Sequence, residues 1–471
     1  MTRPPERRWI WHITLLALCC GLRLLVPAMA WAHTQLVSST PPAGSTITVS
    51  PKELRLWFNE APELVMTVVT LADSGGRLVT LGPIERVIDS TLTLRVKVMS
   101  PLADGRYVVK WKTFGADGHA AQGEYSFLVF LNAPAHRVAT QPASVTTVDS
   151  TVPAAVREKS AQRAPKPRRD SLPFIVVRTI LFTTMLAMIG AVVFRTAVLP
   201  RTPGSDKEGR ARLLVQIAGS SALASFAFLA AALVRLFLQN HMVEYGLEID
   251  VPIREIIFHS RWGVGWLTIT GSVSVAALGF ILASRRKDAG WVFAAIGCLG
   301  LSAGMSIGGH PEATDHFKAL SMVSNSVHAF AAGGWLGTLL WFTWSAMPYL
   351  QSTGDGRAQR LKYMTNAFSP VALTCVAIVA LTGLVNAWLR LGTLNELWES
   401  LYGQVLMAKL AFAGVVANFG YVNWRRVRPR LGAKSGATAL LTSTARSELA
   451  FSIFVIITTA VLVALPAPGA P

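Results

Sequence analysis

The chain has 471 residues, of which 52% are hydrophobic and 15% are charged, and its formal net charge at pH 7 is +18. The apolar residues form long blocks and the mean hydropathy is +0.43, which argues against an ordinary soluble protein and favours several membrane spans. The basic residues cluster between these blocks, as membrane topology requires, so we expect the lipid bilayer as a partner and no nucleic acid.

Residues 1–32 have the layout of a secretory signal peptide. Basic residues precede an apolar stretch at 13–25, and "AWA" at 30–32 fits the small-x-small cleavage rule. Cleavage after Ala32 would make His33 the first residue of the mature protein, with a free α-amine beside its imidazole. That pair of nitrogens is a chelate that no internal residue can supply.

Residues 33–131 have the pattern of a small all-β domain, which we expect to be an Ig-like sandwich. Apolar and polar residues alternate in "ELRLWFNE", "TLTLRVKV" and "RYVVKWKTF", which is typical of half-buried strands. In the second run we expect Leu92, Leu94, Val96 and Val98 on one face. Turn sequences such as "DSGGR" and "LADGR" separate the runs, as in β-sandwiches.

Residues 132–170 are rich in Pro, Ala, Ser, Thr and basic residues, so we predict a flexible tether. Residues 171–471 are strongly apolar and predict an all-α polytopic membrane domain of about eight transmembrane helices. The expected spans are 172–199, 211–238, 258–283, 289–309, 320–347, 367–391, 401–423 and 447–466.

The distribution of basic residues predicts the orientation of this domain. The loops at 200–212, 284–288, 348–365 and 424–446 contain sixteen Lys and Arg residues, whereas the opposite loops contain only Arg254 and Lys318. By the positive-inside rule the basic loops are cytoplasmic. We therefore expect a multi-pass protein of the bacterial inner or plasma membrane, with its N-terminal domain on the extracytoplasmic side.

A metal site is predicted near the end of the β-domain, in "GADGHAAQGEYSFLV". Asp117 and His119 lie two residues apart on a turn, and His33 can add its amine and imidazole. Such nitrogen-rich ligation with one oxygen favours Cu(II), although zinc is an alternative. A simpler interpretation is that Asp117 belongs to a turn and that His119 is a surface residue. No disulfide framework or CxxC motif is present.

Two resemblances extend this interpretation. With its expected N-terminal His, "SSTPPAGSTI", "LRLWFNEAP" and "ADGHAAQGEYSF", the β-domain resembles the CopC copper-resistance family. That resemblance implies an Ig-like sandwich that binds Cu(II) through His33, Asp117 and His119.

The membrane domain resembles the CopD family of copper-resistance membrane proteins. The resemblance lies in the segments "VSNSVHAFAAGGWLGTLLWF", "ALTGLVNAWLRL", "YGQVLMAKLAFAGVVANFGYVNWRR" and "ARSELAFSI". The chain thus resembles a CopC–CopD fusion, which implies copper import or periplasmic copper handling.

The membrane domain has its own candidate ligands. All five of its histidines fall on the predicted outer side, and His328 lies deepest. We expect His310, His328, Met305 and Met322 to bind copper as Cu(I) or Cu(II), because soft and borderline ligands suit both states. Lys409 is a candidate functional charge within the seventh span. The alternatives are a helix-packing histidine and a snorkelling or structurally paired lysine.

The favoured function is capture of Cu(II) on the extracytoplasmic domain followed by copper transport across the membrane, most simply import, in copper resistance and homeostasis. We expect no enzymatic activity, and a periplasmic copper donor or reductase is a candidate partner. Two alternatives stay open: a membrane redox protein in which His310 and His328 hold b-type haem, and a membrane-tethered copper chaperone or sensor.

Overall fold

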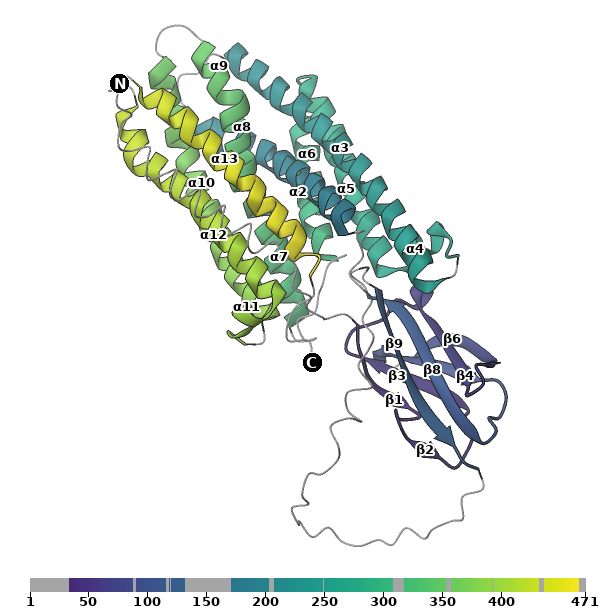
Figure 1. Ribbon diagram of the computed structural model, residues 1–471. Coiled ribbons are helices and arrows are strands. Elements are labelled where there is room, and N and C mark those ends of the chain that lie inside the picture. The colour runs from purple at the N-terminus through teal and green to yellow at the C-terminus, as the bar shows by residue number, and fades with distance from the viewer. Residues whose placement is uncertain are drawn as a thin grey trace. The chain divides into compact units, whose positions relative to one another are not determined.

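The computed structural model describes residues 34–87, 90–115, 118, 120–131, 171–202, 207–248, 250–307, 317–352, 357–391, 393–431 and 436–465. The predicted signal peptide at 1–32 and the predicted tether at 132–170 therefore lie outside the described residues. The chain divides into two compact units. One contains the strands together with residues 240–260, and the other contains most of the helices, so each is described by itself (Figure 1).

The first unit contains a two-sheet β-sandwich, as the alternating sequence predicts. One sheet has the strand order β1-β3-β7-β6, and the other has the order β2-β9-β8-β4-β5. The strands are β1 (Leu36–Thr40), β2 (Thr46–Ile47), β3 (Glu53–Phe58), β4 (Val68–Asp73), β5 (Leu78–Val79), β6 (Leu81–Val87), β7 (Ser90–Val98), β8 (Gly105–Phe114) and β9 (Ala120–Val129). Long side chains from both sheets, including Leu56, Leu94 and Trp111, form the buried core between them.

Strand β7 follows the predicted alternation only in its second half. Leu94 and Val96 are buried as expected, but Leu92 is exposed and Thr93 is buried. The pairing of β6 with β7 shifts register between Arg86 and Val87, and the Thr93 hydroxyl donates to Ser90 Oγ. This irregularity changes which side chains of β7 face the core.

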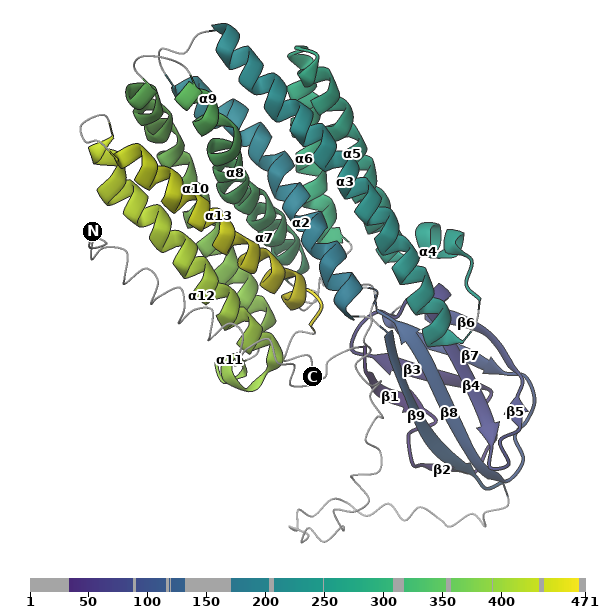
Figure 2. The same cartoon turned by 45° about the horizontal axis from the view of Figure 1, so that its top comes forward.

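The second unit is a bundle of long apolar helices (Figure 2). The α-helices of the described chain are α2 (Ser171–Val193), α3 (Lys207–Leu247), α4 (Ile253–His259), α5 (Arg261–Ser284), α6 (Ala289–Ile307), α7 (Lys318–Ala332), α8 (Thr338–Trp341), α9 (Met347–Ser352), α10 (Arg357–Arg390), α11 (Glu396–Glu399), α12 (Leu401–Val422) and α13 (Ala437–Leu462). The C-terminal end of α3 and all of α4 belong to the first unit. We call the end of the bundle where α2, α7 and α12 begin the Ser171 end, and the opposite end the Arg201 end.

Seven helical segments of the described chain are long and apolar enough to cross a membrane. They are Leu172–Arg201, Lys207–Leu247, Arg261–Ser284, Ala289–Ile307, Ala358–Arg390, Leu401–Arg430 and Ala437–Leu462. The remaining predicted span, 320–347, is helical but interrupted: wide π turns at η8 (Gly333–Gly337) and η9 (Phe342–Ala346) separate α7, α8 and α9. The prediction of about eight membrane helices therefore agrees with the fold, with one helix broken into segments.

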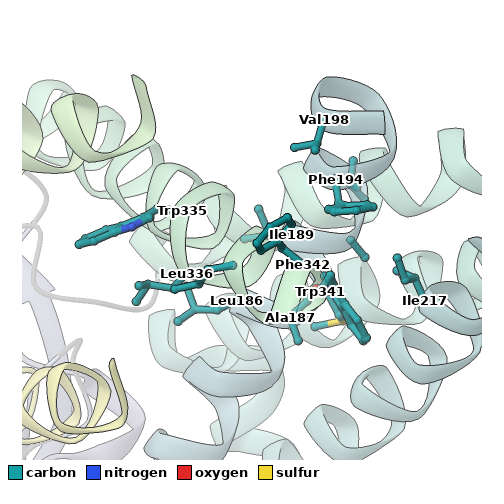
Figure 3. Close-up of a cluster of buried hydrophobic side chains, with 14 of the residues drawn as sticks. Leu186, Ala187, Ile189, Phe194, Val198, Ile217, Trp335, Leu336, Trp341 and Phe342 are labelled. Carbon is teal, nitrogen blue, oxygen red and sulfur yellow. The ribbon is translucent and has the colours of Figure 1, made fainter. Parts of the chain in front are cut away.

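Helix α2 and the π turn η8 cross in close contact at two glycines. A methyl group added to Gly337 would overlap the Leu186 carbonyl and Gly190, and one added to Gly190 would overlap the Gly337 backbone. Figure 3 shows the side chains packed around this crossing, including Ile189 and Phe342. The small-residue run "AAGGWLG" thus permits close helix packing at these glycines.

Candidate metal centre

The three predicted ligands of the β-domain, His33, Asp117 and His119, all lie outside the described residues, and so does His310 of the membrane domain. Within the described part of the chain, no three or more His, Cys, Asp or Glu side chains are grouped so that they could hold a metal ion. The predicted site residues of the β-domain are therefore neither brought together nor kept apart by the described structure.

Described residues close to these ligands in the sequence form hydrogen bonds with one common segment, Asn59–Glu63. On one side the Gln35 backbone N–H donates to Asn59 Oδ1 over 2.7 Å, just after the start of the expected mature chain. On the other side the Glu63 N–H donates to the Phe114 carbonyl over 2.9 Å, and Pro62 bridges to Gly115. Gln35 and Gly115, described residues near these predicted ligands in the sequence, thus both contact the Asn59–Glu63 segment.

In the bundle, His328 of α7 is held by α10. Its Nδ1 lies 2.9 Å from Thr382 Oγ1, and the single hydroxyl proton of Thr382 is donated to the Ile378 carbonyl over 2.6 Å. When the Thr382 hydroxyl donates to the Ile378 carbonyl, Thr382 Oγ1 accepts from the Nδ1–H of His328, and in that tautomer the lone pair of Nε2 can bind a metal ion. A backbone hydrogen bond also joins His328 to Val379.

Close packing of α7 against α10 helps to position the imidazole. Gly383 lies beside the His328 ring, and a methyl group there would come within 3.4 Å of Cε1. Ser324, one turn before His328 on α7, donates to the Thr382 carbonyl over 3.3 Å. The imidazole orientation is thus set by two successive residues of α10.

The two predicted methionine ligands lie on a different contact. Met322 shares a helical stripe with Ser326, which hydrogen-bonds to Ser306 of α6 over 2.9 Å. Met305 is the residue before Ser306 on α6 and is partly buried. Because residues 326 and 328 point in nearly opposite directions on a helix, the methionines belong to the α6–α7 contact and His328 to the α7–α10 contact.

Lys409 lies on α12 in the half of the bundle nearest the Ser171 end. Its charge interacts with His328 and with Arg390, which ends α10. In the described chain it forms no ion pair with a carboxylate. The predicted functional charge therefore contributes positive potential beside the predicted histidine ligand, so a cation bound at His328 would experience repulsion from it.

The sequence analysis missed Glu448 of α13. Its side chain is buried, and it lines a cavity of about 160 Å³ together with Trp335, Phe368 and Asn423. The expected span began at 447 and placed Glu448 at a helix end, whereas α13 begins at Ala437. A lone acidic residue between two apolar runs, "TALLTSTARSELAFSIFV", was the signal that could have identified it.

The architecture defines the class: a multi-pass membrane protein with an added β-sandwich domain. Comparison with known families then identifies the two parts. The sequence model of the CopC domain matches residues 36–130, and that of copper resistance protein D matches residues 362–462. The chain belongs to the copper-resistance family in which a CopC domain and a CopD domain are fused.

Individual relatives agree with this assignment. The chain is 25% identical to copper transport protein CutJ of Bacillus subtilis strain 168, over 99% of this chain and 79% of that protein. It is 32% identical to copper resistance protein C of Pseudomonas syringae pv. tomato, over 22% of this chain and 87% of that protein. The crystal structure of CopC from Methylosinus trichosporium OB3b is 31% identical, covers 22% of this chain and 100% of its own, and gives a TM-score of 0.20.

Proposed function

We propose that the protein captures Cu(II) on an extracytoplasmic β-domain and moves copper through the membrane bundle into the cell. Family membership supports copper as the cargo, because the relatives are described as copper transport and copper resistance proteins. The predicted plan supports the order of events: signal peptide 1–32, capture domain 33–131, tether 132–170 and membrane domain 171–471. The excess of basic residues in the loops at the Arg201 end favours placing that end in the cytoplasm.

We propose His33, Asp117 and His119 as the capture site. The contacts of Gln35 and Gly115 with the Asn59–Glu63 segment support this proposal, because Gln35 is two residues from His33 in the sequence and Gly115 is two residues from Asp117. Three nitrogen atoms and one carboxylate oxygen would then be available to one ion, a set that suits Cu(II). The amine of His33 belongs to this set only if the signal peptide is removed after Ala32.

The observation that carries the transport proposal is the hydrogen bond between His328 and Thr382. In the tautomer with the proton on Nδ1, Nε2 of His328 would bind copper inside the helix bundle. His310, Met305 and Met322 are proposed as further ligands on the approach from the Ser171 end. An imidazole and thioethers together can bind Cu(I) as well as Cu(II).

Copper uptake into proteoliposomes that contain the full-length protein tests this function. Uptake of Cu(I), kept reduced with ascorbate, and of Cu(II) is measured for the wild type, for His328→Ala and for His259→Ala. His259 is the matched control, because its side chain is exposed on α4 and hydrogen-bonds to Glu255 over 3.0 Å.

We expect His328→Ala to abolish uptake of the transported copper ion, whereas His259→Ala retains it. Binding of Cu(II) to the β-domain should be equal in both variants, and equal thermal unfolding temperatures in detergent show that each bundle is folded. Normal uptake by well-expressed His328→Ala protein would refute the role of His328. Absence of uptake by the wild type, with Cu(I) and Cu(II) alike, would refute transport itself.

A further inference from the structure

The Glu448 carboxyl group lies near the middle of the bundle in a setting that favours its neutral form. Residue 448 lies between the ends of α13 at 437 and 462, and its side chain is only 4% exposed. The cavity beside it is lined mainly by apolar and aromatic side chains. Burial of an unpaired carboxylate in such surroundings costs several kcal/mol, so the group must carry a proton or meet a cation.

The polar contacts of Glu448 come from neutral groups. Asn423 Nδ2 donates to Glu448 Oε2 over 3.4 Å, and the Trp335 side chain also hydrogen-bonds to the carboxyl group. Gly420 makes room for the carboxyl group, because a methyl group there would lie 3.3 Å from Oε1. These contacts orient the carboxyl group, but they do not balance a negative charge.

No described charged side chain pairs with Glu448. The only other titratable side chain lining the cavity is that of Tyr421. The basic residues on or next to the elements packed against α13 are Arg178 of α2, Arg195 just after α2, Lys409 of α12, and Arg425, Arg426, Arg428 and Arg430 just after α12. On α13 itself Arg446 is exposed. Arg428 donates to Asn366 and Arg195 pairs with Asp288, so these two are engaged elsewhere.

We propose that Glu448 is a proton-binding group coupled to copper passage: it carries a proton while the cavity holds no metal ion, and it releases that proton when a copper ion enters. In this step the carboxyl O–H bond breaks, the proton leaves to water, and the carboxylate balances the charge of the ion. No electron is transferred. The aromatic side chains Trp335, Phe342 and Phe368 can also stabilise a cation through their ring faces.

This inference rests on the proposed copper transport, and it would supply a route by which protons influence that transport. His328 and the Glu448 cavity lie in different parts of the bundle. His328 precedes Trp335 by seven residues, or about 10 Å along a helix. Copper that leaves His328 toward the Arg201 end would therefore approach the Glu448 cavity next.

Infrared difference spectroscopy on the full-length protein in lipid nanodiscs tests the proposal directly. Ag(I) serves as a redox-inert probe of a monovalent metal ion, and spectra are recorded with and without it. We expect the wild type to lose a carboxylic-acid C=O band when Ag(I) is added. The band should be absent from Glu448→Gln and shifted in Glu448→Asp, and it should persist in Glu399→Gln, the matched control at an exposed glutamate of α11.

A band that persists in Glu448→Gln, or that does not respond to the metal in the wild type, would overturn the proposal. Proteoliposome uptake then separates this result from failure of transport. If the wild type takes up copper but lacks the metal-sensitive band, only the proton proposal fails. If the band responds to Ag(I) but no copper is taken up, transport fails and Glu448 remains a metal-sensitive proton site. Equal thermal unfolding temperatures in detergent confirm that the bundle of each variant is folded.

Discussion

In the β-sandwich the proposed ligands come from the chain terminus and from one loop, whereas in the bundle the polar groups belong to the helices themselves. A terminus and a loop can change their chemistry without disturbing the strands, whose core is apolar. In the bundle His328, Lys409 and Glu448 lie on helices whose packing depends on small residues and tight crossings. The comparison indicates that metal capture can be altered separately from the fold, while transport cannot be altered so freely.

The strongest test of this difference is an extension of the mature N-terminus. One glycine placed before His33 converts its amine to an amide, which is a poor ligand unless it is deprotonated. We expect Cu(II) binding to the β-domain of the full-length protein to weaken by at least about 100-fold, or roughly 3 kcal/mol. Competition titration against a chelator of known affinity measures the change.

Two substitutions in the proposed capture site can be compared with the N-terminal extension for their effect on Cu(II) affinity. Asp117→Ala should weaken Cu(II) binding less than His119→Ala, because a carboxylate is the weaker ligand for Cu(II). Copper uptake by the extended protein should persist when copper is saturating, since the bundle is unchanged. Equal Cu(II) affinity with and without the glycine would show that the His33 amine is not a ligand.

A second test addresses packing in the bundle. Gly337→Ala forces a methyl group into the backbone of α2, so we expect the bundle to lose about 1–3 kcal/mol of stability. Gly414→Ala is the control, because nothing lies within 4 Å of a methyl group there and alanine favours the helix. Thermal unfolding in detergent measures both variants.

The sandwich should still bind Cu(II) in each of these variants, since its core contains no residue of the bundle. An unchanged unfolding temperature for Gly337→Ala would mean that α2 and the π turn can separate without cost. Reduced Cu(II) affinity would mean that the two regions depend on each other, against the comparison drawn above.

The sequence predicted the two kinds of fold well because both signals are periodic or cumulative. Alternation predicts strands such as β8, and long apolar runs predict membrane helices. It predicted local departures poorly. The irregularity of β7 that exposes Leu92 depends on pairing with β6, and the breaks in the fifth span depend on packing of Gly333–Gly337 against α2. Such features arise from contacts between distant segments.

The candidate site divides in the same way. His328 could be identified because depth in an apolar segment is visible in the sequence. Its partner Thr382 could not, because the pairing depends on the rotation of α7 and α10 about their axes. Glu448 was missed for a different reason: α13 begins ten residues before the expected start of the span, so its depth was misjudged. The ligands proposed for the β-domain remain predictions.

Removal of the Thr382 hydroxyl tests whether tautomer control matters in the bundle. Thr382→Val removes the hydroxyl that contacts His328 Nδ1 and keeps the backbone contact of His328 with Val379. Loss of such a supporting hydrogen bond typically weakens metal binding by about 10- to 100-fold. We expect about a tenfold rise in the copper concentration that gives half-maximal uptake. Thr382→Ser should restore the wild-type value.

Thr458→Val is the matched control for this prediction. Thr458 is a buried helix threonine, whereas Thr382 is partly buried, and the Thr458 hydroxyl likewise donates to a carbonyl of its own helix, that of Phe454, over 2.7 Å. Its replacement removes the same atoms without touching a histidine, so uptake should not change. If both valine variants are impaired equally, the effect belongs to helix packing and not to His328.

The smallest expected effect on copper uptake comes from substitution of Lys409. The direction of the change shows whether this lysine limits or supports copper binding at His328. Lys409→Gln removes a positive charge that acts on His328, so a copper ion at the imidazole is repelled less. We expect half-maximal uptake at about three- to tenfold lower copper concentration, equivalent to roughly 1 kcal/mol of removed repulsion. Lys318→Gln is the control: this lysine begins α7 and is exposed to solvent, where water and salt screen its charge, so uptake should not change. Weaker uptake by Lys409→Gln, together with normal folding, would show that the lysine supports the site instead of limiting cation entry. It would then act through a partner that an amide cannot satisfy, as a structurally paired lysine does.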